Sequence, residues 1–593
     1  MQKPFKPSRL FLSCALAGML VSGCSTGGIT SAASSLFGGN EEGTDKVRIN
    51  QVGYLPASTK QALVPAGDQT WFTVINTSTD REVFRGQLSE PMAWPLADEV
   101  ARIADFSALK TPGEYRIQVK GVKASYHFRI DEAAYEAVNA ASIRAFYLNR
   151  VSIELLPEFA GDYARPAGHP DTRVLVHASA ASKQRPEGTV IASPKGWYDA
   201  GDYNKYIVNS GISTYTLLSA YEHFPEFYRQ QSLNIPESGN QVPDLLDEIW
   251  WNLEWMLTMQ DPEDGGVYHK LTNKQFDGVI MPHEAVTPRY VVQKTTTAAL
   301  NFAAVMASAS RVFAEYESAW PGVSQNMLAA AESAWRWAVA NPDVAYQQPE
   351  DIATGAYGDG QFADEFAWAA AELYITTGND NYYRTFALSK PVIGVSSWSQ
   401  VQGLPWISLA HHLDRLTPAA DKHHIREQVL GEARSLLEAS QASVYRLPMQ
   451  AGDFKWGSNS VALNQAVMVL QGYRLSGERA YLDVAQSLLD YTLGKNPLNT
   501  SYVTGFGSRS PQHIHHRPSE ADGIRAPIPG FIAGGPNPGQ QDLDDCPQAY
   551  PSHLPAKSWL DHWCSYASNE VAINWNAPLV YVSGAVQVLT GKE

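Results

Sequence analysis

Two patterns of apolar and polar positions divide the chain near residue 131. Before it, short alternating runs at 71–75, 115–119 and 125–130 are separated by turn signals such as Thr-Pro-Gly at 111–113. Alternation with a period of two predicts strands that bury one face. Residues 46–131 are therefore predicted to form a small β-sandwich.

Beyond residue 131 the apolar positions recur at helical spacing. In 243–260, for example, Leu246, Ile249, Leu253 and Leu257 share one stripe. The same spacing predicts helices at 132–151, 295–316, 323–340, 364–377, 425–440, 460–475 and 480–493. No comparable series of strands is visible, so 132–593 is predicted to be a mostly α domain of roughly ten to twelve helices, paired into a ring or a solenoid. A long loop rich in Pro, Gly and His, 501–569, interrupts the helices, and such loops are usually functional.

The N-terminus carries a targeting pattern. Lys3, Lys6 and Arg9 precede an apolar stretch at 10–21, which is too short for a membrane span and has the charge order of a secretory signal. The sequence up to Cys24 resembles a bacterial lipobox, followed by Ser and not by the Asp of inner-membrane retention. Residues 1–24 are thus predicted to be a lipoprotein signal with Cys24 acylated, and 25–45 a flexible tether. An exported lipoprotein, on either face of the outer membrane, is expected; an ordinary cleaved signal is the alternative.

The composition of the chain limits the classes of molecule that it can bind. Charged residues make up 18% of the chain and the net charge is -16. Nucleic acid is excluded, because phosphate binding needs clustered Lys and Arg and no such run occurs. The 16 Trp and 28 Tyr suit both large cores and sugar-stacking clefts.

Two cysteines, Cys546 and Cys564, remain once Cys14 and Cys24 are assigned to the N-terminal signal. In an exported protein we expect them to form a disulfide, with two buried free thiols as the alternative.

Three polar constellations are predicted to lie on loops flanked by helices, where a rigid scaffold places reactive groups. In 196–206, Asp199 and Asp202 stand three residues apart among aromatics that include Trp197 and Tyr198, and such a pair can activate a water molecule; an ordinary acidic turn is the alternative. In 510–517, His515, His516 and Arg517 can bind hydroxyls or steady a carboxylate. Zinc is disfavoured there, because no Cys or acidic residue stands at a ligand-like spacing.

The third constellation, 559–577, contains Asp561, Tyr566 and Glu570. Glu570 opens an apolar helical run, and a partly desolvated carboxyl beside Tyr566 and Trp575 has a raised pKa and can act as a general acid. A helix N-terminal position would lower its pKa instead. A paired-Asp base with a separate Glu acid is what inverting glycoside hydrolysis requires, with the carboxyl functions about 6.5–9.5 Å apart.

At these residues the chain resembles glycoside hydrolase family 9, inverting β-1,4-glucanases with an (α/α)6 barrel. Two family signatures match at every constrained place, the first through Thr504, Gly507, Arg509, Ile514, His515 and Arg517, the second through Trp559, Asp561, Tyr566, Glu570, Ala572, Asn576 and Ala577. The segment 47–54 resembles the start of the immunoglobulin-like module that precedes the barrel in one branch of the family, where its expected role is packing support.

The resemblance implies a role for each site residue. Asp202 would be the general base, Asp199 its partner on the same water, and Glu570 the general acid. His515 and Arg517 would bind sugar hydroxyls, and Asp561 would orient neighbouring donors. Further substrate contacts are expected from His516, Trp197, Tyr198 and Tyr566.

Two departures concern metals. Many members with this module carry a zinc site of Cys and His upstream of the paired Asp residues, and the corresponding stretch 165–170 has no Cys, which argues against zinc. For the family's calcium site Asp364 and Glu365 remain as oxygen ligands, while the later Asp is absent around 397–399, so structural calcium is left open. No cofactor is required for the reaction.

The expected function is an endoglucanase or cellodextrinase that cleaves β-1,4-linked glucans, acts as a monomer and meets the membrane only through its lipid. An exo-β-glucosaminidase on chitosan oligosaccharides is the alternative, since the same scaffold can accept a 2-amino sugar if an extra carboxylate lies in the cleft. A non-catalytic surface glycan-binding lipoprotein is disfavoured, because Asp199, Asp202 and Glu570 are all present.

Overall fold

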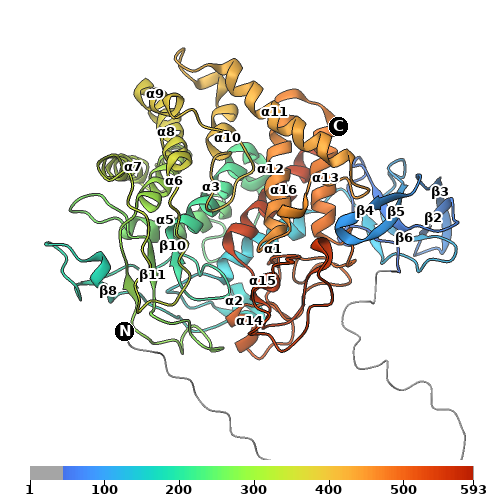
Figure 1. Ribbon diagram of the computed structural model, residues 1–593, viewed down its shortest axis with the longest axis horizontal. Helices are drawn as coiled ribbons and strands as arrows, with labels where there is room; N and C mark the ends of the chain where they lie inside the picture. The colour runs from blue at the N-terminus through green and yellow to red at the C-terminus, as the bar shows by residue number, and fades with distance from the viewer. Residues whose placement is uncertain (1–44, 592–593) are drawn as a thin grey trace, which may run out of the picture. The chain divides into compact units, whose positions relative to one another are not determined.

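The computed structural model describes residues 45–591 (Figure 1). The predicted signal at 1–24, its lipidation site Cys24 and nearly all of the tether at 25–45 lie outside the described residues, so these three stay predictions.

Residues before 131 form two antiparallel sheets, which confirms the predicted β-sandwich. One sheet has the order β1 (Gln61–Pro65), β5 (Glu99–Asp105), β4 (Met92–Trp94), and the other the order β3 (Arg81–Gln87), β2 (Trp71–Asn76), β6 (Gly113–Gln118), β7 (Phe128–Ile130). Alternate residues point inward, as Phe72 and Val74 do on β2 and Tyr115 and Ile117 on β6, and they share one apolar core. The alternation in sequence is therefore the inside–outside alternation of the strands.

Six helices of the described part form a closed inner ring, in which each packs on the next (Figure 1). In ring order they are α3 (Ile207–His223), α6 (Thr296–Phe313), α8 (Ala363–Thr377), α10 (Leu404–His411), α12 (Ser458–Ser476) and α16 (Ile573–Thr590). Most residues of these helices are buried, because neighbouring ring helices and the outer helices pack around them. The stretch Thr296–Tyr316 is apolar enough to cross a membrane by composition, yet 89% of its apolar window is buried inside the protein.

Six further helices pack outside this ring, one against each inner helix. They are α1 (Glu136–Leu148), α5 (Asp244–Thr258), α7 (Val323–Ala340), α9 (Asp380–Leu388), α11 (Lys422–Gln441) and α13 (Arg479–Thr492). Helix α7 shows why they stay outside: it buries only Met327, Ala331, Ala334, Trp335 and Ala338, a single stripe at helical spacing. The result is the (α/α)6 barrel, with short helices α2 (Pro157–Ala160), α4 (Pro225–Gln230), α14 (Arg517–Ala521) and α15 (Tyr566–Asn569) in the connections.

The expectation of no strands beyond residue 131 was wrong. A five-stranded sheet runs in the order β10 (Lys205–Tyr206), β11 (Lys270–Thr272), β12 (Tyr290–Val291), β8 (Val174–Val176), β9 (Val190–Ile191). Strands of two or three residues are too short to show a period, so the pattern of the sequence could not reveal them. The sheet matters because β10 and β11 lie beside the paired Asp residues.

The sandwich and the barrel share apolar packing. Val52, Leu55, Leu63 and Trp94 of the sandwich belong to the same continuous core as the barrel helices. Trp94 packs on Tyr445 with ring centroids 4.5 Å apart. The N-terminal module is thus built into the barrel wall.

Candidate active site

A cavity of about 970 Å³ opens where the inner helices begin. Its walls come from the segments that lead into α3, α8, α10, α12 and α16, and from the loop at 515–517. Three carboxylates predicted to act together, Asp199, Asp202 and Glu570, all line it. Segments far apart in the sequence are thereby brought to one mouth of the barrel.

The two aspartates are buried, and each accepts two side-chain hydrogen bonds. Asp199, 1% exposed, accepts from Asn209 Nδ2 at 2.6 Å and from the hydroxyl of Tyr357 at 2.8 Å. Asp202, 6% exposed, accepts from Asn204 Nδ2 at 2.5 Å and from the hydroxyl of Tyr206 at 2.9 Å. These bonds fix both carboxyls, which excludes the alternative of an ordinary acidic turn.

Burial and mutual repulsion separate the protonation of the pair. Burial first, and then the charge of Asp202, raise the pKa of Asp199 to about 8. Burial also raises the pKa of Asp202, but the cations of Arg517 and Lys270 oppose that rise at Asp202 alone. These cations make Asp202 the more readily ionised member of the pair.

Glu570 does not open a helix, contrary to the expectation from sequence. It follows α15 in extended conformation, φ −67° and ψ 161°, and α16 begins three residues later at Ile573. Its Oε1 accepts from the N–H of Gly201 at 3.3 Å. Burial, and then the charge of Asp202, raise the pKa of Glu570 to about 8, so the desolvated environment decides and not a helix dipole.

Gly201 lets the loop that carries Asp199 and Asp202 approach the segment 493–516, which carries His515 and is called the histidine loop below. A Cβ at this position would lie 2.4 Å from the backbone oxygen of His515 and 3.2 Å from Oε1 of Glu570. Arg517 tightens the same contact, since its Nη1 donates to the Gly201 oxygen at 2.6 Å. The acid and the two aspartates are thus joined through a backbone position that has room only for hydrogen.

His515 is a neutral acceptor on the cavity wall. Its Nδ1 donates to the backbone oxygen of Trp563 at 2.8 Å, which leaves Nε2 as the acceptor. The ring stacks on Trp563 with centroids 4.3 Å apart. Burial lowers the pKa of His515 to about 4, so the imidazole carries no charge at neutral pH.

Three residues expected to contact substrate lie elsewhere. Trp197 is fully buried and donates from Nε1 to Glu248 at 2.7 Å, and Tyr198 is buried with its hydroxyl 2.8 Å from Nδ1 of His169. His516 is fully buried between Ser519 and Asn149. Each is a structural residue behind the wall of the cavity, and the expectation of a sugar contact is corrected.

Asp561 and Tyr566 support the site in different ways. Asp561 accepts from the backbone N–H groups of Gln512 and His513, each at 2.9 Å, and does not line the cavity. Tyr566 does line it, and its hydroxyl donates to Asp545 at 2.8 Å. Asp561 therefore holds the backbone of the loop that carries His515, while Tyr566 faces the cavity.

Sequence reasoning placed Trp575 beside Glu570 but missed the rest of the aromatic lining. Phe276, Tyr357, Trp398, Trp456 and Trp575 all face the cavity. Phe276 and Trp456 remain 48% and 40% exposed, and such half-exposed rings in a cleft are suited to stacking on sugars. Trp456 and Tyr357 stand in glycine-containing loops, and an aromatic residue in such a loop is the feature of the sequence that could have predicted a place in the cavity.

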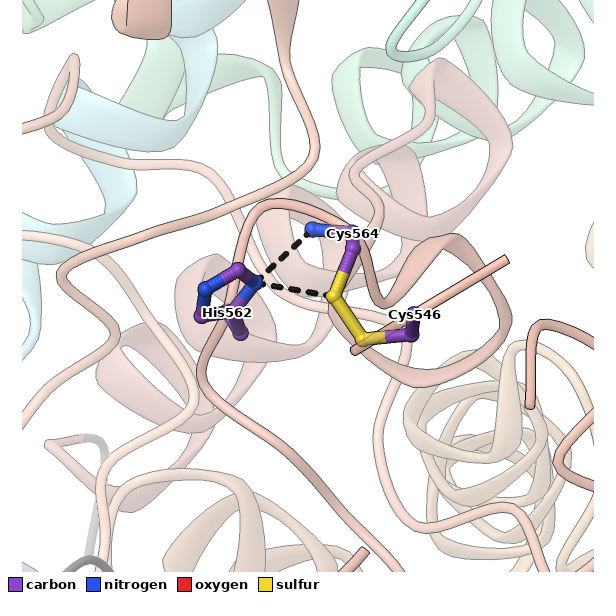
Figure 2. A group of neighbouring side chains, drawn as sticks. All are labelled: Cys546, His562 and Cys564. Atoms are coloured by element: carbon purple, nitrogen blue, oxygen red, sulfur yellow. Dashed lines mark hydrogen bonds between the residues drawn. A yellow bond between two sulfur atoms is a disulfide. The ribbon is translucent and has the colours of Figure 1, made fainter. Parts of the chain in front are cut away.

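A disulfide joins Cys546 and Cys564, with Cα atoms 5.0 Å apart (Figure 2). Nδ1 of His562 lies 2.9 Å from Sγ of Cys564, and the three side chains form a compact group. Both sulfurs are bonded to each other, so neither is a thiolate, the form that ligates metals. The bond instead anchors Asp545, next to Cys546 in sequence, beside Tyr566.

An acidic cluster lies beside the cavity, at the start of α8. Glu365 is fully buried, and neither of its carboxylate oxygens, nor Oδ2 of Asp359, has a hydrogen-bond partner. Burial raises the pKa of Glu365, and the negative charges of Asp364 and Asp359 raise it further. Buried oxygens without donors are what a hard cation such as Ca²⁺ requires.

The sequence matches two family models, "Glycosyl hydrolase family 9" over residues 135–583 and "Cellulase N-terminal ig-like domain" over residues 42–124. The chain belongs to glycosyl hydrolase family 9. A xyloglucan-specific endo-β-1,4-glucanase of Bacteroides ovatus is 44% identical over 92% of this chain and 94% of its own. Endoglucanase D of Acetivibrio thermocellus is 31% identical over 91% and 83%.

The fold of this family 9 enzyme agrees with solved structures. A family 9 structure from Bacteroides ovatus superposes with a TM-score of 0.86 and 41% identity, over 92% of this chain and all of the other. The protein is a glycoside hydrolase that cleaves β-1,4-glucans. The glucosaminidase and the non-catalytic alternatives gain no support from these relatives.

Gly201→Ala is expected to lower the rate of hydrolysis of a soluble β-1,4-glucan by about 10²-fold, because the added methyl must displace the His515 backbone and with it Glu570. Initial rates, with circular dichroism as a check on folding, measure this. Gly431→Ala is the control, since its added Cβ meets nothing within 4 Å. Equal activity of the two variants would show that the close approach is not needed.

Proposed function

We propose that this protein is an inverting endo-β-1,4-glucanase of soluble, branched glucans of the xyloglucan type. The observation that carries the proposal is the 44% identity, over nearly the full length of both chains, to a xyloglucan-specific endo-β-1,4-glucanase. The cavity of about 970 Å³ and its half-exposed Phe276 and Trp456 support it, since a branched chain needs room and apolar surface to stack on.

The carboxyls divide the chemistry between two faces of the sugar. Glu570, protonated at neutral pH, donates its proton to the glycosidic oxygen as the bond from that oxygen to C1 breaks. A water held by Asp199 attacks C1 from the opposite face, and ionised Asp202 takes the proton that this water loses. The product has an inverted, α-configured reducing end, and exchange of protons with solvent resets both carboxyls.

The neighbouring groups assist this displacement. Nε2 of neutral His515 accepts from a sugar hydroxyl, and Arg517 keeps Asp202 ionised. Tyr206 and Tyr357 hold Asp202 and Asp199 at fixed orientations. Fixed donors and acceptors of this kind need no rearrangement during the reaction.

Glu570→Gln is expected to abolish hydrolysis of an unactivated β-1,4 bond while oligosaccharide binding stays near the wild-type level, because the amide cannot supply the proton. In the wild type, kcat/KM should fall as the pH rises through about 8, where Glu570 loses its proton. Initial rates across pH and calorimetric binding measure both effects.

Glu520→Gln, an exposed residue of α14 near the same loop, serves as the matched control and should keep full activity. Unchanged turnover in Glu570→Gln, or an alkaline limb that is absent up to pH 10, would remove Glu570 from the acid role.

Substrate choice is tested by comparing kcat/KM on xyloglucan, mixed-linkage glucan and carboxymethylcellulose, with product sizes followed over time. The proposal expects the highest value on xyloglucan and an early mixture of large oligosaccharides, which is the result of internal cleavage. A preference for unbranched glucan would retain the β-1,4-glucanase and overturn the branched substrate. Release of single small products from the first minutes would overturn endo action.

We also propose that Asp359, Asp364 and Glu365 bind a structural Ca²⁺, which would neutralise the buried carboxylates and fix the start of α8. Thermal unfolding should occur at a higher temperature with CaCl₂ than with EDTA, by an amount equivalent to about 2.7 kcal/mol when calcium is at one hundred times its Kd.

Glu365→Gln should lose this dependence on calcium, whereas Glu350→Gln, an exposed acid nearby, should keep it. Identical melting temperatures of the wild type in calcium and in EDTA would rule out the metal.

A further inference from the structure

The N-terminal module reaches the loop that carries His515 and Arg517. Residue Gln51, in the segment before β1, is only 6% exposed and lies against the barrel. Its backbone N–H donates to the oxygen of Leu493, just after α13, at 2.9 Å. This contact aligns the module with the end of an outer helix, where the histidine loop begins.

The side-chain amide of Gln51 bridges the two ends of the segment 499–509. Nε2 donates to the backbone oxygen of Asn499 at 2.9 Å, and Oε1 accepts from the backbone N–H of Arg509 at 3.0 Å. The amide therefore takes the place of a peptide group of a neighbouring strand. The bond to Asn499 is buried and the bond to Arg509 is partly buried, so the amide holds two backbone positions of the loop away from bulk water.

Two glycines show that the barrel is shaped around this side chain. A Cβ on Gly494, at φ +128°, would lie 2.8 Å from Cγ of Gln51, and one on Gly507, at φ +90°, would lie 3.0 Å from its Oε1. Positive φ values favour glycine, and the close approach excludes anything larger. The loop therefore encloses Gln51 and does not merely touch it.

The second anchor of the loop lies next to the catalytic carboxyl. Asp561 holds the N–H groups of Gln512 and His513, and Asn569 donates to the oxygen of His513 at 2.9 Å. The N–H of His515 then donates to the oxygen of Asn569 at 2.9 Å, one residue before Glu570. Only Ser510 and Pro511 separate Arg509, which Gln51 holds, from Gln512, which Asp561 holds.

We propose that Gln51 is a positioning residue of the active site: the N-terminal module uses its amide to set the histidine loop, and so the placement of His515 and Arg517 against substrate and Asp202. The module thereby acts on the reaction and goes beyond packing support. The inference rests on the proposed roles of His515 and Arg517, but not on whether the glucan is branched.

The test replaces Gln51 by Met, which keeps the volume and removes both hydrogen bonds. On an unactivated β-1,4-oligosaccharide kcat should fall on the order of tenfold, since small displacements of catalytic groups have large effects on rate. The acidic limb of kcat/KM should also move to higher pH, because a displaced Arg517 holds the Asp202 carboxylate ionised less well. Rates are measured well below the melting temperature.

Thr59→Val is the matched control, because it removes another hydrogen bond between module and barrel, from Thr59 Oγ1 to Asp483 at 2.7 Å, away from the histidine loop. It should lower the melting temperature and leave kcat and the pH profile unchanged. If Gln51→Met also changes the melting temperature alone, Gln51 is structural and the proposal is wrong.

Gln51→Asn decides the matter if the Met variant does not fold. It keeps an uncharged amide that is one methylene too short to hold both Asn499 and Arg509, so an intermediate kcat and an intermediate shift of the acidic limb are expected, and wild-type kinetics would overturn the proposal. His515→Ala tests the proposed function separately from the role of Gln51. Wild-type activity of His515→Ala would overturn the proposed role of His515 itself. A strong loss of activity in His515→Ala, with no effect of the Gln51 substitutions, would overturn only the positioning role of Gln51.

Discussion

Three carboxyls buried at one mouth of a helical barrel are the constraint on which the rest of the structure depends. Burying such groups is unfavourable unless donors or cations compensate for the lost water. Asn209, Tyr357, Asn204 and Tyr206 supply four hydrogen bonds to the two aspartates, and the Gly201 N–H supplies one to Glu570. Gly201, Asn204, Tyr206 and Asn209 lie close to the aspartates in sequence, whereas Tyr357 comes from the loop before α8 and Glu570 from the segment before α16, so the compensation is complete only when these three segments have met.

The compensation is uneven, and the unevenness has a chemical consequence. Arg517 and Lys270 act on Asp202 but not on Asp199, while Glu570 receives only one weak donor and stays protonated. One fold thereby holds a proton donor and a proton acceptor at the same pH. Lys270 also donates to the oxygen of Gly355 at 2.6 Å, so the sheet missed in the sequence both tunes the pair and holds the loop of Tyr357.

The sequence allowed the division near 131, most outer helices and all three carboxyls to be predicted, because each leaves a local trace: a period, a stripe or a motif. What it could not show depends on distant partners. Trp197, Tyr198 and His516 stand in the right motifs, yet other segments bury them, and no local pattern records that burial. Tyr357 contacts Asp199 across 158 positions of the chain, and the strands of the small sheet are too short for any period.

Closure of the inner ring also sets an order of events during folding. Helix α1 packs on α16, with Asn139 donating to the oxygen of Val580 across 441 residues, and Asn576 returns a bond to Ser142 across 434. The strands of the β-sandwich pair with one another within residues 61–130, whereas the ring has to wait for α16. Contacts of such long range form slowly, and partly closed rings expose apolar helix faces meanwhile. An emerging chain of this enzyme therefore depends on protection from aggregation until its final inner helix is in place.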